Sequence, residues 1–365
     1  MKNCPVCRTL AATAAAGTAA AALLVGNAFA QSSVTLSGVA DAAARSVSNE
    51  ERGSVKSLVS GANATSRIII RGSEDLGGGL AASFHLEHGL ALDTGLPTGG
   101  FWDRRSTVSL SSRTAGELRL GRDFVPSYVG WSRFDPFSYV GVAGSNNLVS
   151  ATPVGPIRST FGTAANTTVR ASNTVQYFVP AGLGGFEGHA MVAAGEGVTA
   201  ANGGAKVIGL RLGWSGGPVS VSAAHTRSEN DLTASGKFED SAVGGTIRFG
   251  PARVNLAWRQ FEQNASKQTN TILSGSFIVG AGEIKASIVR ANLSGRVGAT
   301  VIDANDAQQV GLGYVHNLSK RTALYGTLAR IDNDGAATFV IPGGPAGLAG
   351  GRSSTGVEAG VRHLF

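Results

Sequence analysis

Cysteine, charged residues and aromatic residues are all scarce in this sequence. Only 15% of the 365 residues are charged and 7% are aromatic, and the two cysteines, Cys4 and Cys7, lie at its beginning. After residue 30, no apolar run reaches the about 20 residues of a membrane-spanning helix, which excludes a bundle of such helices. The 52 glycines follow no three-residue period, which excludes collagen. Because the hydrophobic content of 42% is too high for a disordered chain, a large β protein remains.

Residues 1–30 are typical of a secretory signal peptide. Lys2 and Arg8 precede an Ala-rich apolar stretch, which ends in the small-residue cleavage pattern AFA. We therefore expect cleavage after Ala30, which leaves residues 31–365 as a single domain. Cleavage would remove both cysteines, so their C-x-x-C spacing predicts neither a redox motif nor a zinc site.

From residue 31 onward, apolar residues recur at every second position, which is typical of strands with one apolar face. Clear examples lie at 67–71, 107–110, 117–121, 253–259 and 284–288. The opposite face of these segments is polar and often cationic. Such two-faced strands are expected either in a soluble sandwich or solenoid, or in a membrane barrel.

The connections between these segments alternate between short and long. The short ones lie at 73–79, 112–116, 181–185, 215–218, 250–252, 279–282 and 317–321. The long ones lie near 48–64, 89–101, 124–166, 195–205, 228–239, 262–269, 291–306 and 333–353. Seven short and eight long connections predict 16 strands, and this layout is typical of a bacterial outer-membrane β-barrel. Closure of the sheet pairs every backbone polar group, so such a barrel can cross lipid. We expect the alternating segment that ends at Phe365 to close the barrel.

Several segments resemble the general porins of β-proteobacteria, of the Neisseria, Bordetella and Comamonas type. These are QSSVTLSGVADAA at 31–43, SRIIIRGSEDLGGGL at 66–80, RRSTVSLSS at 104–112, LRLGRDFVPSY at 118–128, GYVHNLSKRTALYG at 313–326 and GVRHLF at 360–365. The resemblance implies an all-β, 16-stranded antiparallel transmembrane barrel that forms a homotrimer, with the third long loop folded into the lumen. His363 departs from the pattern, because many barrels carry a large apolar or aromatic residue there.

The third long connection, 124–166, is far longer than the about 4–6 residues of a typical loop. It carries five aromatic residues that can pack against a wall: Trp131, Phe134, Phe137, Tyr139 and Phe161. Because a barrel of 16 strands leaves an aqueous channel, the lumen has room for a folded loop. We expect this loop to narrow the channel and to set its size limit.

Charge at the constriction is expected to decide which ions pass, because a narrow passage with low-dielectric walls focuses the field of its lining groups. Alternation places four arginines on the inner face: Arg67, Arg71, Arg119 and Arg170. The loop adds one acid, Asp135, against Arg133 and Arg158. The constriction should therefore be positive and favour small anions. An alternative is that individual arginines only solvate the lumen or bind lipopolysaccharide phosphate.

The resemblance implies a slightly different set of residues. The arginine cluster of the family matches Arg67, Arg104 and Arg170, and its loop acid matches Asp135. Alternation counted along 107–110 instead points Arg105 into the lumen. Strand ends near loops often bulge, so both Arg104 and Arg105 remain candidates.

These patterns predict a passive, weakly anion-selective general porin of the outer membrane. We expect a homotrimer that contacts membrane lipid and lipopolysaccharide, passes small anionic or neutral solutes, binds no nucleic acid and needs no cofactor or metal. We expect no enzymatic activity, because the sequence has no G-x-S-x-G elbow and its histidines lack the spacing of metal ligands. The alternatives are a substrate-specific anion channel, a barrel hydrolase and an adhesive surface protein.

Overall fold

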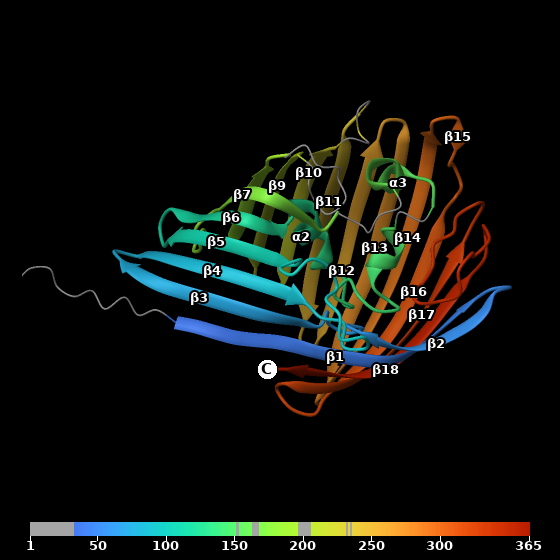
Figure 1. Cartoon of the computed structure of the whole chain (residues 1–365), viewed down its shortest axis with the longest axis horizontal. Helices are drawn as coiled ribbons and strands as arrows, with labels where there is room; N and C mark the ends of the chain where they lie inside the picture. The colour runs from blue at the N-terminus through green and yellow to red at the C-terminus, as the bar shows by residue number, and fades with distance from the viewer. Residues whose placement is uncertain (1–32, 151–152, 163–167, 196–205, 231–232, 234–235) are drawn as a thin grey trace, which may run out of the picture.

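The alternating segments form strands that close into one antiparallel sheet (Figure 1). The computed structural model describes residues 33–150, 153–162, 168–195, 206–230, 233 and 236–365. The predicted signal peptide, its cleavage site and most of the predicted connection at 195–205 lie outside the described residues. Within the described part of the chain, no helix is long and apolar enough to cross a membrane.

The sheet contains 18 assigned strands. They are β1 (Ser33–Asn49), β2 (Gly53–Ser60), β3 (Arg67–Gly77), β4 (Leu80–Gly89), β5 (Arg105–Ser112), β6 (Gly116–Phe124), β7 (Arg170–Phe178), β8 (Phe186–Ala193), β9 (Lys206–Gly216), β10 (Val219–Glu229), β11 (Phe238–Phe249), β12 (Ala252–Gln263), β13 (Ser266–Val279), β14 (Gly282–Val297), β15 (Thr300–Val301), β16 (Ala307–Asn317), β17 (Thr322–Asn333) and β18 (Ser354–Leu364).

These 18 assigned strands correspond to the 16 barrel strands (staves) that the sequence predicts, because two of them are parts of longer strands or hairpins. The short β2 and the following β3 pair with successive parts of β1, so together they form one interrupted stave. The two-residue β15 only extends the hairpin at the end of β14. Pairing of β1 with β18, from Val39 opposite Leu364 to Asn49 opposite Ser354, closes the barrel. The predicted fold class is confirmed.

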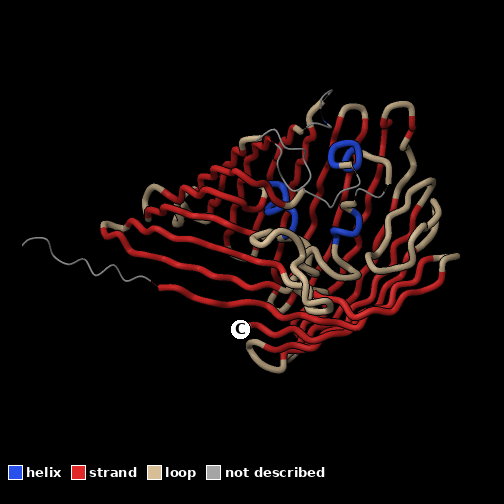
Figure 2. The backbone as a smooth tube through the Cα atoms, viewed as in Figure 1, coloured by secondary structure: helices blue, strands red, loops and turns tan. Residues whose placement is uncertain are grey.

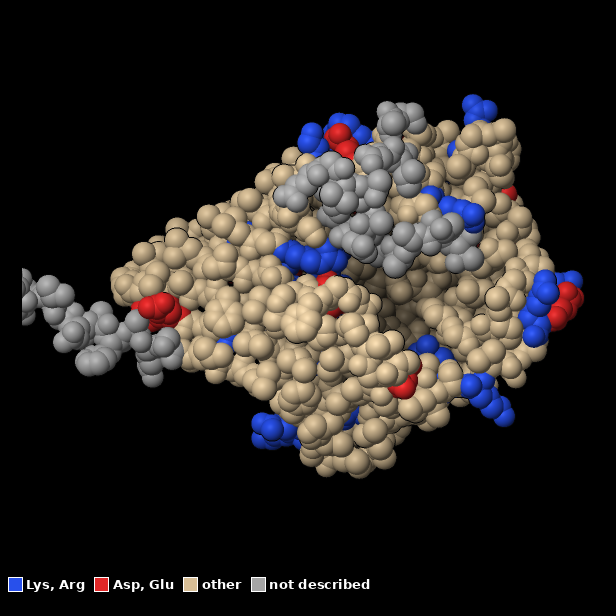
Figure 3. Space-filling model, in the orientation of Figure 1, with Lys and Arg blue, Asp and Glu red and all other residues tan. Residues whose placement is uncertain are grey.

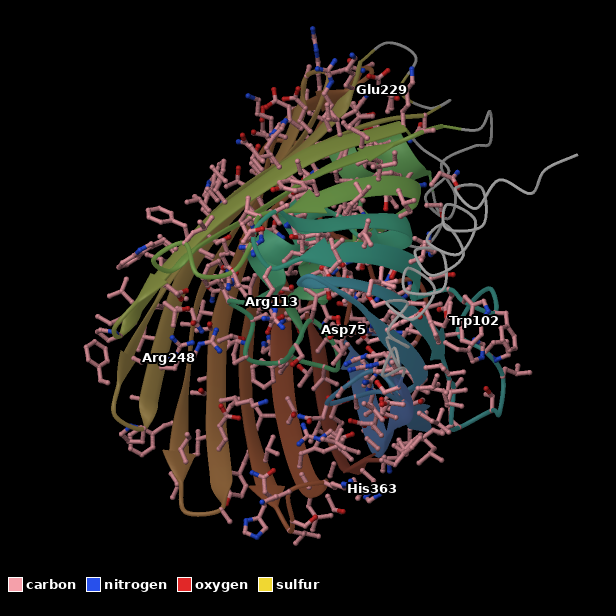
Figure 4. All side chains as sticks on the ribbon, turned by 90° about the vertical axis from the view of Figure 1, so that its left-hand side faces the viewer. Asp75, Trp102, Arg113, Glu229, Arg248 and His363 are labelled. Atoms are coloured by element: carbon pink, nitrogen blue, oxygen red, sulfur yellow. The ribbon has the colours of Figure 1, made fainter. Side chains whose placement is uncertain are left out.

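The two faces of each strand have opposite character. On β12, Leu256 is 59% exposed on the outside, whereas its neighbour Asn255 is 1% exposed on the inside. Contact between apolar side chains and water is unfavourable, whereas their contact with lipid hydrocarbon is not. The apolar outer face is therefore suited to a membrane. Figure 4 marks the two ends of neighbouring strands, with Glu229 at the end of β10 and Arg248 near the opposite end of β11.

All seven predicted short connections join consecutive strands at one end of the barrel, but three of the predicted long loops are wrong. In 291–306, β14 continues to Val297 and β15 follows at Thr300–Val301, so only 302–306 and the turn at 298–299 leave the sheet. Most of 48–64 is a hairpin of β1 and β2, and only 61–66 leaves the sheet. The connection at 262–269 is a tight turn, in which Asn264 adopts a left-handed conformation with φ of 53°. The stretch at 262–269 is polar on both faces, and the stretch at 48–64 has only a few apolar residues without a regular alternation, so both resemble loops in the sequence.

The connection between β6 and β7 folds into the barrel and holds all the helices assigned in the described residues (Figure 2). It contains α2 (Pro126–Ser132), the 3-10 helix η1 (Ser145–Leu148) and α3 (Pro156–Phe161). These helices contact β8–β14 and β16. The five aromatic residues of the loop pack in one buried cluster with inward side chains of those strands, such as Ile272 and Val289. The loop therefore covers one half of the inner wall.

Candidate functional site

The half of the barrel that the loop leaves open, β3–β7, carries the predicted arginines. Figure 3 shows a hollow in the molecule with lysine and arginine atoms beside it. The inner wall here is polar, and the channel runs between this wall and the folded loop. The constriction is therefore lined by two different surfaces, one made of strand side chains and one made of the loop.

Glu87, on β4, lies at the centre of the first group of cationic side chains. Its carboxylate accepts a hydrogen bond from Arg104 Nε at 2.5 Å and lies 3.5 Å from Arg67 Nε. His85 Nε2 lies 3.3 Å from the other oxygen of the same carboxylate. Sequence reasoning did not single out Glu87, although the alternation of His85 and Glu87 along β4 would have placed both on the inner face.

Arg104 and Arg105 both reach the inner wall, so both candidates that the sequence left open are found there. Arg105 is the first residue of β5 and lies opposite Glu87, so it follows the alternation. Arg104 precedes the strand, and its guanidinium turns inward to Glu87. Because strand geometry does not constrain a residue outside the sheet, two consecutive side chains can enter the same channel.

A second group of charges lies on β5 and β6. Arg119 contacts Asp123 at 2.8 Å and Glu117 at 2.9 Å, and its guanidinium lies 4.1 Å above the ring of Phe178. Arg105 contacts the same Asp123 at 3.4 Å. These carboxylates hold the arginines in place and neutralise part of their charge.

Arg170 lacks the ion pairs that Arg67, Arg104, Arg105 and Arg119 form. In the described part of the chain it has no carboxylate within ion-pair distance, and its Nε has no hydrogen-bond partner. Its guanidinium lies 4.3 Å from the centre of the Phe124 ring, which stacks on Tyr128 at 4.9 Å. Tyr128 in turn packs edge-on against Tyr139 at 5.2 Å. Three aromatic rings, Phe124 at the end of β6 and Tyr128 and Tyr139 in the loop, thus support a cation whose charge is not neutralised.

Asp135 lies inside the folded loop and is only 6% exposed. Its carboxylate accepts backbone hydrogen bonds from Phe137 at 2.8 Å and from Ser145 at 2.7 Å. Burial has the larger effect and raises the pKa of Asp135 above its ordinary value, although these hydrogen bonds lower it. This acid therefore shapes the loop and does not present its carboxylate to the channel.

The balance of charge on the open wall is positive. The six predicted arginines, at positions 67, 71, 104, 105, 119 and 170, outnumber the three carboxylates with which members of this group form ion pairs, Glu87, Glu117 and Asp123. Arg71 is exposed and forms no ion pair with any described residue. No group of acidic or histidine residues in the described ranges could hold a metal ion. The positive side chains of this wall can attract anions, and they lie along the channel.

The model of the Gram-negative porin family matches residues 9–336. The chain belongs to this family. Outer membrane porin protein 32 of Delftia acidovorans is 35% identical to this porin over 358 residues, which cover 93% of this chain and 96% of that protein. An outer membrane porin protein of Bordetella pertussis is 26% identical over 350 residues, or 84% of each chain.

Solved structures agree with this assignment. An anion-selective porin from Comamonas acidovorans matches with a TM-score of 0.77 and 35% identity, over 92% of this chain and 100% of that one. OmpT of Vibrio cholerae in its trimer form matches with a TM-score of 0.62 over 92% of this chain and 99% of that one, and its 15% identity shows the fold alone. The predicted family, the porin function and the location in the bacterial outer membrane are confirmed.

Asp41 of the porin anchors the segment that leads into the constriction. It is fully buried on β1, and its carboxylate accepts hydrogen bonds from the backbone of Ala64 at 2.8 Å and from Tyr325 Oη at 2.5 Å. The backbone N–H groups of 62 and 63 donate to the same carboxylate. The anchored segment, 61–66, ends directly before Arg67, so Asp41 fixes the approach to that arginine.

Replacing Asp41 with Ala should release segment 61–66 and leave several buried N–H groups without an acceptor. Each unsatisfied buried donor costs about 1–3 kcal/mol, so we expect a lower thermal unfolding temperature and a noisier open-channel current. Differential scanning calorimetry and single-channel recording measure the two effects. Asp332→Ala is the matched control, because Asp332 is exposed and pairs with the equally exposed Arg330. Equal effects of the two substitutions would contradict the anchoring role.

Proposed function

We propose that this porin is a general diffusion channel with weak anion selectivity. The observation that carries the proposal is the open wall, on which the six predicted arginines outnumber the three carboxylates that pair with them. The anion-selective porin from Comamonas acidovorans, at 35% identity, supports it. Passage is passive, so no covalent step, cofactor or metal enters the mechanism.

The geometry gives each side of the channel a separate role. The loop occupies one half of the lumen and sets the size of solute that fits. The arginines of the other half replace part of the hydration of an anion with fixed positive charge, at a point where low-dielectric walls strengthen the field. Because three carboxylates neutralise part of that charge, cations and neutral solutes meet only a modest barrier.

We also propose that the channel works as a homotrimer surrounded by lipid and lipopolysaccharide. Small outward positions on β1, at Ala40, Ala42 and Ala44, alternate with the inward Asp41 and Arg45. Small side chains let neighbouring barrels approach closely. Cross-linking of membranes followed by gel electrophoresis tests the assembly, and a monomer that conducts normally would overturn it.

The selectivity is tested by reversal potentials in planar bilayers under a KCl gradient. We expect a preference for chloride, and we expect Arg67→Ala, Arg104→Ala and Arg170→Ala each to reduce it. The reduction should be largest for Arg170, because its charge is not neutralised by a carboxylate of the described chain. Lys56→Ala is a matched control, because Lys56 lies on the exposed outer part of β2. A cation preference of the unmodified porin would refute the proposal.

The remaining alternatives are tested with the same purified protein. A barrel hydrolase would cleave a chromogenic ester or peptide, whereas we expect no turnover above the detergent blank. An adhesive surface protein would give no ion conductance. Either outcome would replace the proposed channel function.

A further inference from the structure

An apolar groove lies on the outer surface of the barrel, over β8–β11. It has a volume of about 420 Å³, and it begins beside the short turns that join β7 to β8 and β9 to β10. The side chains that form its walls and floor are apolar and point outward, as the 58% exposure of Leu212 shows. They include Leu183, Phe186, Leu212, Trp214, Ala223 and Val243.

The groove results from the way in which two bulky side chains lie on the sheet. The indole of Trp214 lies toward the turn, over Gly216, where a Cβ would collide with the ring. The side chain of Leu212 leans over Gly188 on β8, where a Cβ would be 3.1 Å from its Cδ2. On its other side, Leu212 lies opposite Ala223 of β10. Because both bulky side chains lean away from Ala223, its methyl group forms a low floor between them.

The groove lies at the depth of one membrane leaflet. The short connections of outer-membrane barrels lie on the periplasmic side, so a groove beside these turns belongs to the periplasmic leaflet. Phe186 and Trp214 lie opposite each other next to the turns, as in the aromatic belt of a membrane–water interface. In the strand order, β8–β11 lie across the barrel from β1 and β18, where we propose the trimer contact. The groove therefore faces lipid in a monomer and in a trimer.

The residues that border the groove direct no charged side chain toward it. The stretches 179–186 and 213–221 contain no aspartate, glutamate, lysine or arginine. Glu187 is part of the border, but its carboxylate turns into the barrel, where it lies 2.6 Å from Arg133 and 3.1 Å from Arg211. A ligand of this groove must therefore be recognised by its apolar part.

We propose that the groove binds one acyl chain of a phospholipid of the periplasmic leaflet. Lipid hydrocarbon is as apolar as leucine, so the hydrophobic effect alone does not favour the groove over bulk lipid. The gain comes from van der Waals contact, because an unfilled groove leaves its walls without partner atoms. A chain on the floor at Ala223 contacts Leu212, Trp214 and Val243 at the same time. The groove is a continuous part of the lipid-facing surface, so a lipid chain reaches it without leaving the membrane.

The site makes one lipid a lasting part of the barrel surface. It rests on the outer-membrane location of the porin and is independent of the proposed anion selectivity, because its apolar walls face away from the channel. The volume of about 420 Å³ lies within the about 300–1,000 Å³ of small-molecule sites. A site of this size and shape holds one flexible chain in preference to the surrounding lipid, which contacts the barrel only along one side.

The test measures lipid binding to the purified porin in detergent, with dioleoyl phosphatidylethanolamine as the probe. By native mass spectrometry, we expect one lipid per protomer to bind with a half-saturating concentration at least tenfold below that of any further lipid. Ala223→Leu fills the floor and should raise this concentration about tenfold. Ala286→Leu is the matched control, with an expected change of less than twofold, because Ala286 is exposed on the outer face of β14 and does not line the groove.

Trp214 reports the position of the bound chain. The same lipid with brominated acyl chains quenches tryptophan fluorescence on contact, so it should quench the porin at the half-saturating concentration of the tight lipid. Trp214→Phe should abolish the quenching at this concentration. Dioleoyl phosphatidylglycerol should bind as tightly as the phosphatidylethanolamine, because no charged side chain of the border faces the groove.

The outcomes separate the site from other uses of the groove. Absence of the tight lipid, or equal effects of Ala223→Leu and Ala286→Leu, would overturn the proposal. Tight binding of phosphatidylglycerol alone would show recognition of the headgroup and would also overturn it. Pairs of trimers that Ala223→Leu separates would assign the groove to a second copy of the porin instead. A porin that prefers cations but keeps the tight lipid would refute the proposed selectivity and leave the lipid site intact.

Discussion

Replacing Phe124 with Leu is expected to lower the chloride preference nearly as much as replacing Arg170 itself. The guanidinium of Arg170 lies 4.3 Å from the centre of the Phe124 ring and has no ion-pair partner among the described residues. A cation–π contact contributes about 0.5–2 kcal/mol, which is enough to hold a side chain in one orientation. Leucine fills similar space but has no aromatic face, so the cation should leave its position above the channel.

Reversal potentials under a KCl gradient measure this effect, and Phe178→Leu supplies the matched control. Phe178 lies below Arg119 at 4.1 Å in the same kind of contact, but Arg119 is also held by Asp123 and Glu117. We therefore expect little change in that variant. In an Arg170→Ala background, Phe124→Leu should have no further effect. A further loss of chloride preference there would show that Phe124 acts by another route.

Replacing Glu87 with Gln should raise the chloride preference and lower the stability of the barrel. The substitution removes a negative charge beside Arg67 and Arg104 while it keeps the size of the side chain. Breaking a buried ion pair costs about 3–5 kcal/mol, because it leaves a charge without a partner. The pair here is partly accessible, with Arg67 26% exposed, so we expect a loss toward the lower end of that range.

Reversal potential and thermal unfolding should be measured on the same Glu87→Gln preparation. Glu283→Gln is the matched control, because Glu283 lies 3.7 Å from Lys285 in a loose pair and is 35% exposed. We expect smaller changes in both quantities for that variant. An unchanged or reduced chloride preference in Glu87→Gln would contradict the role of this carboxylate in limiting the positive charge of the constriction.

Period-2 alternation predicts the two-faced strands and the inward direction of Arg67 and Arg71, and the count of short and long connections predicts the 16 strands of the barrel. The reason is physical, since a strand between lipid and water must have one apolar and one polar face. The same argument fails where a segment leaves the lipid. There, the regular alternation is lost, and the hairpin of β1 and β2 resembles a loop in the sequence.

The details of the constriction depend on contacts that no local pattern contains. Arg104 lies outside its strand, so alternation cannot place it, and only the structure shows that it meets Glu87. The sequence predicts Asp135 at the channel because it is the acid of the loop. Its carboxylate instead binds backbone N–H groups at 137 and 145, a fold of the loop that residue type alone does not specify.

The pairing of β1 with β18 has a consequence for biogenesis. Val39 and Leu364 are neighbours in the finished sheet although nearly the whole chain separates them. Until β18 docks, both margins of the sheet expose unpaired backbone groups, which are templates for aggregation. Such a distant contact also forms slowly, since chain closure over this length carries a large entropic penalty. The nascent polypeptide therefore requires shielding during transit, and a chain truncated before Ser354 should aggregate and give no open channel in planar bilayers.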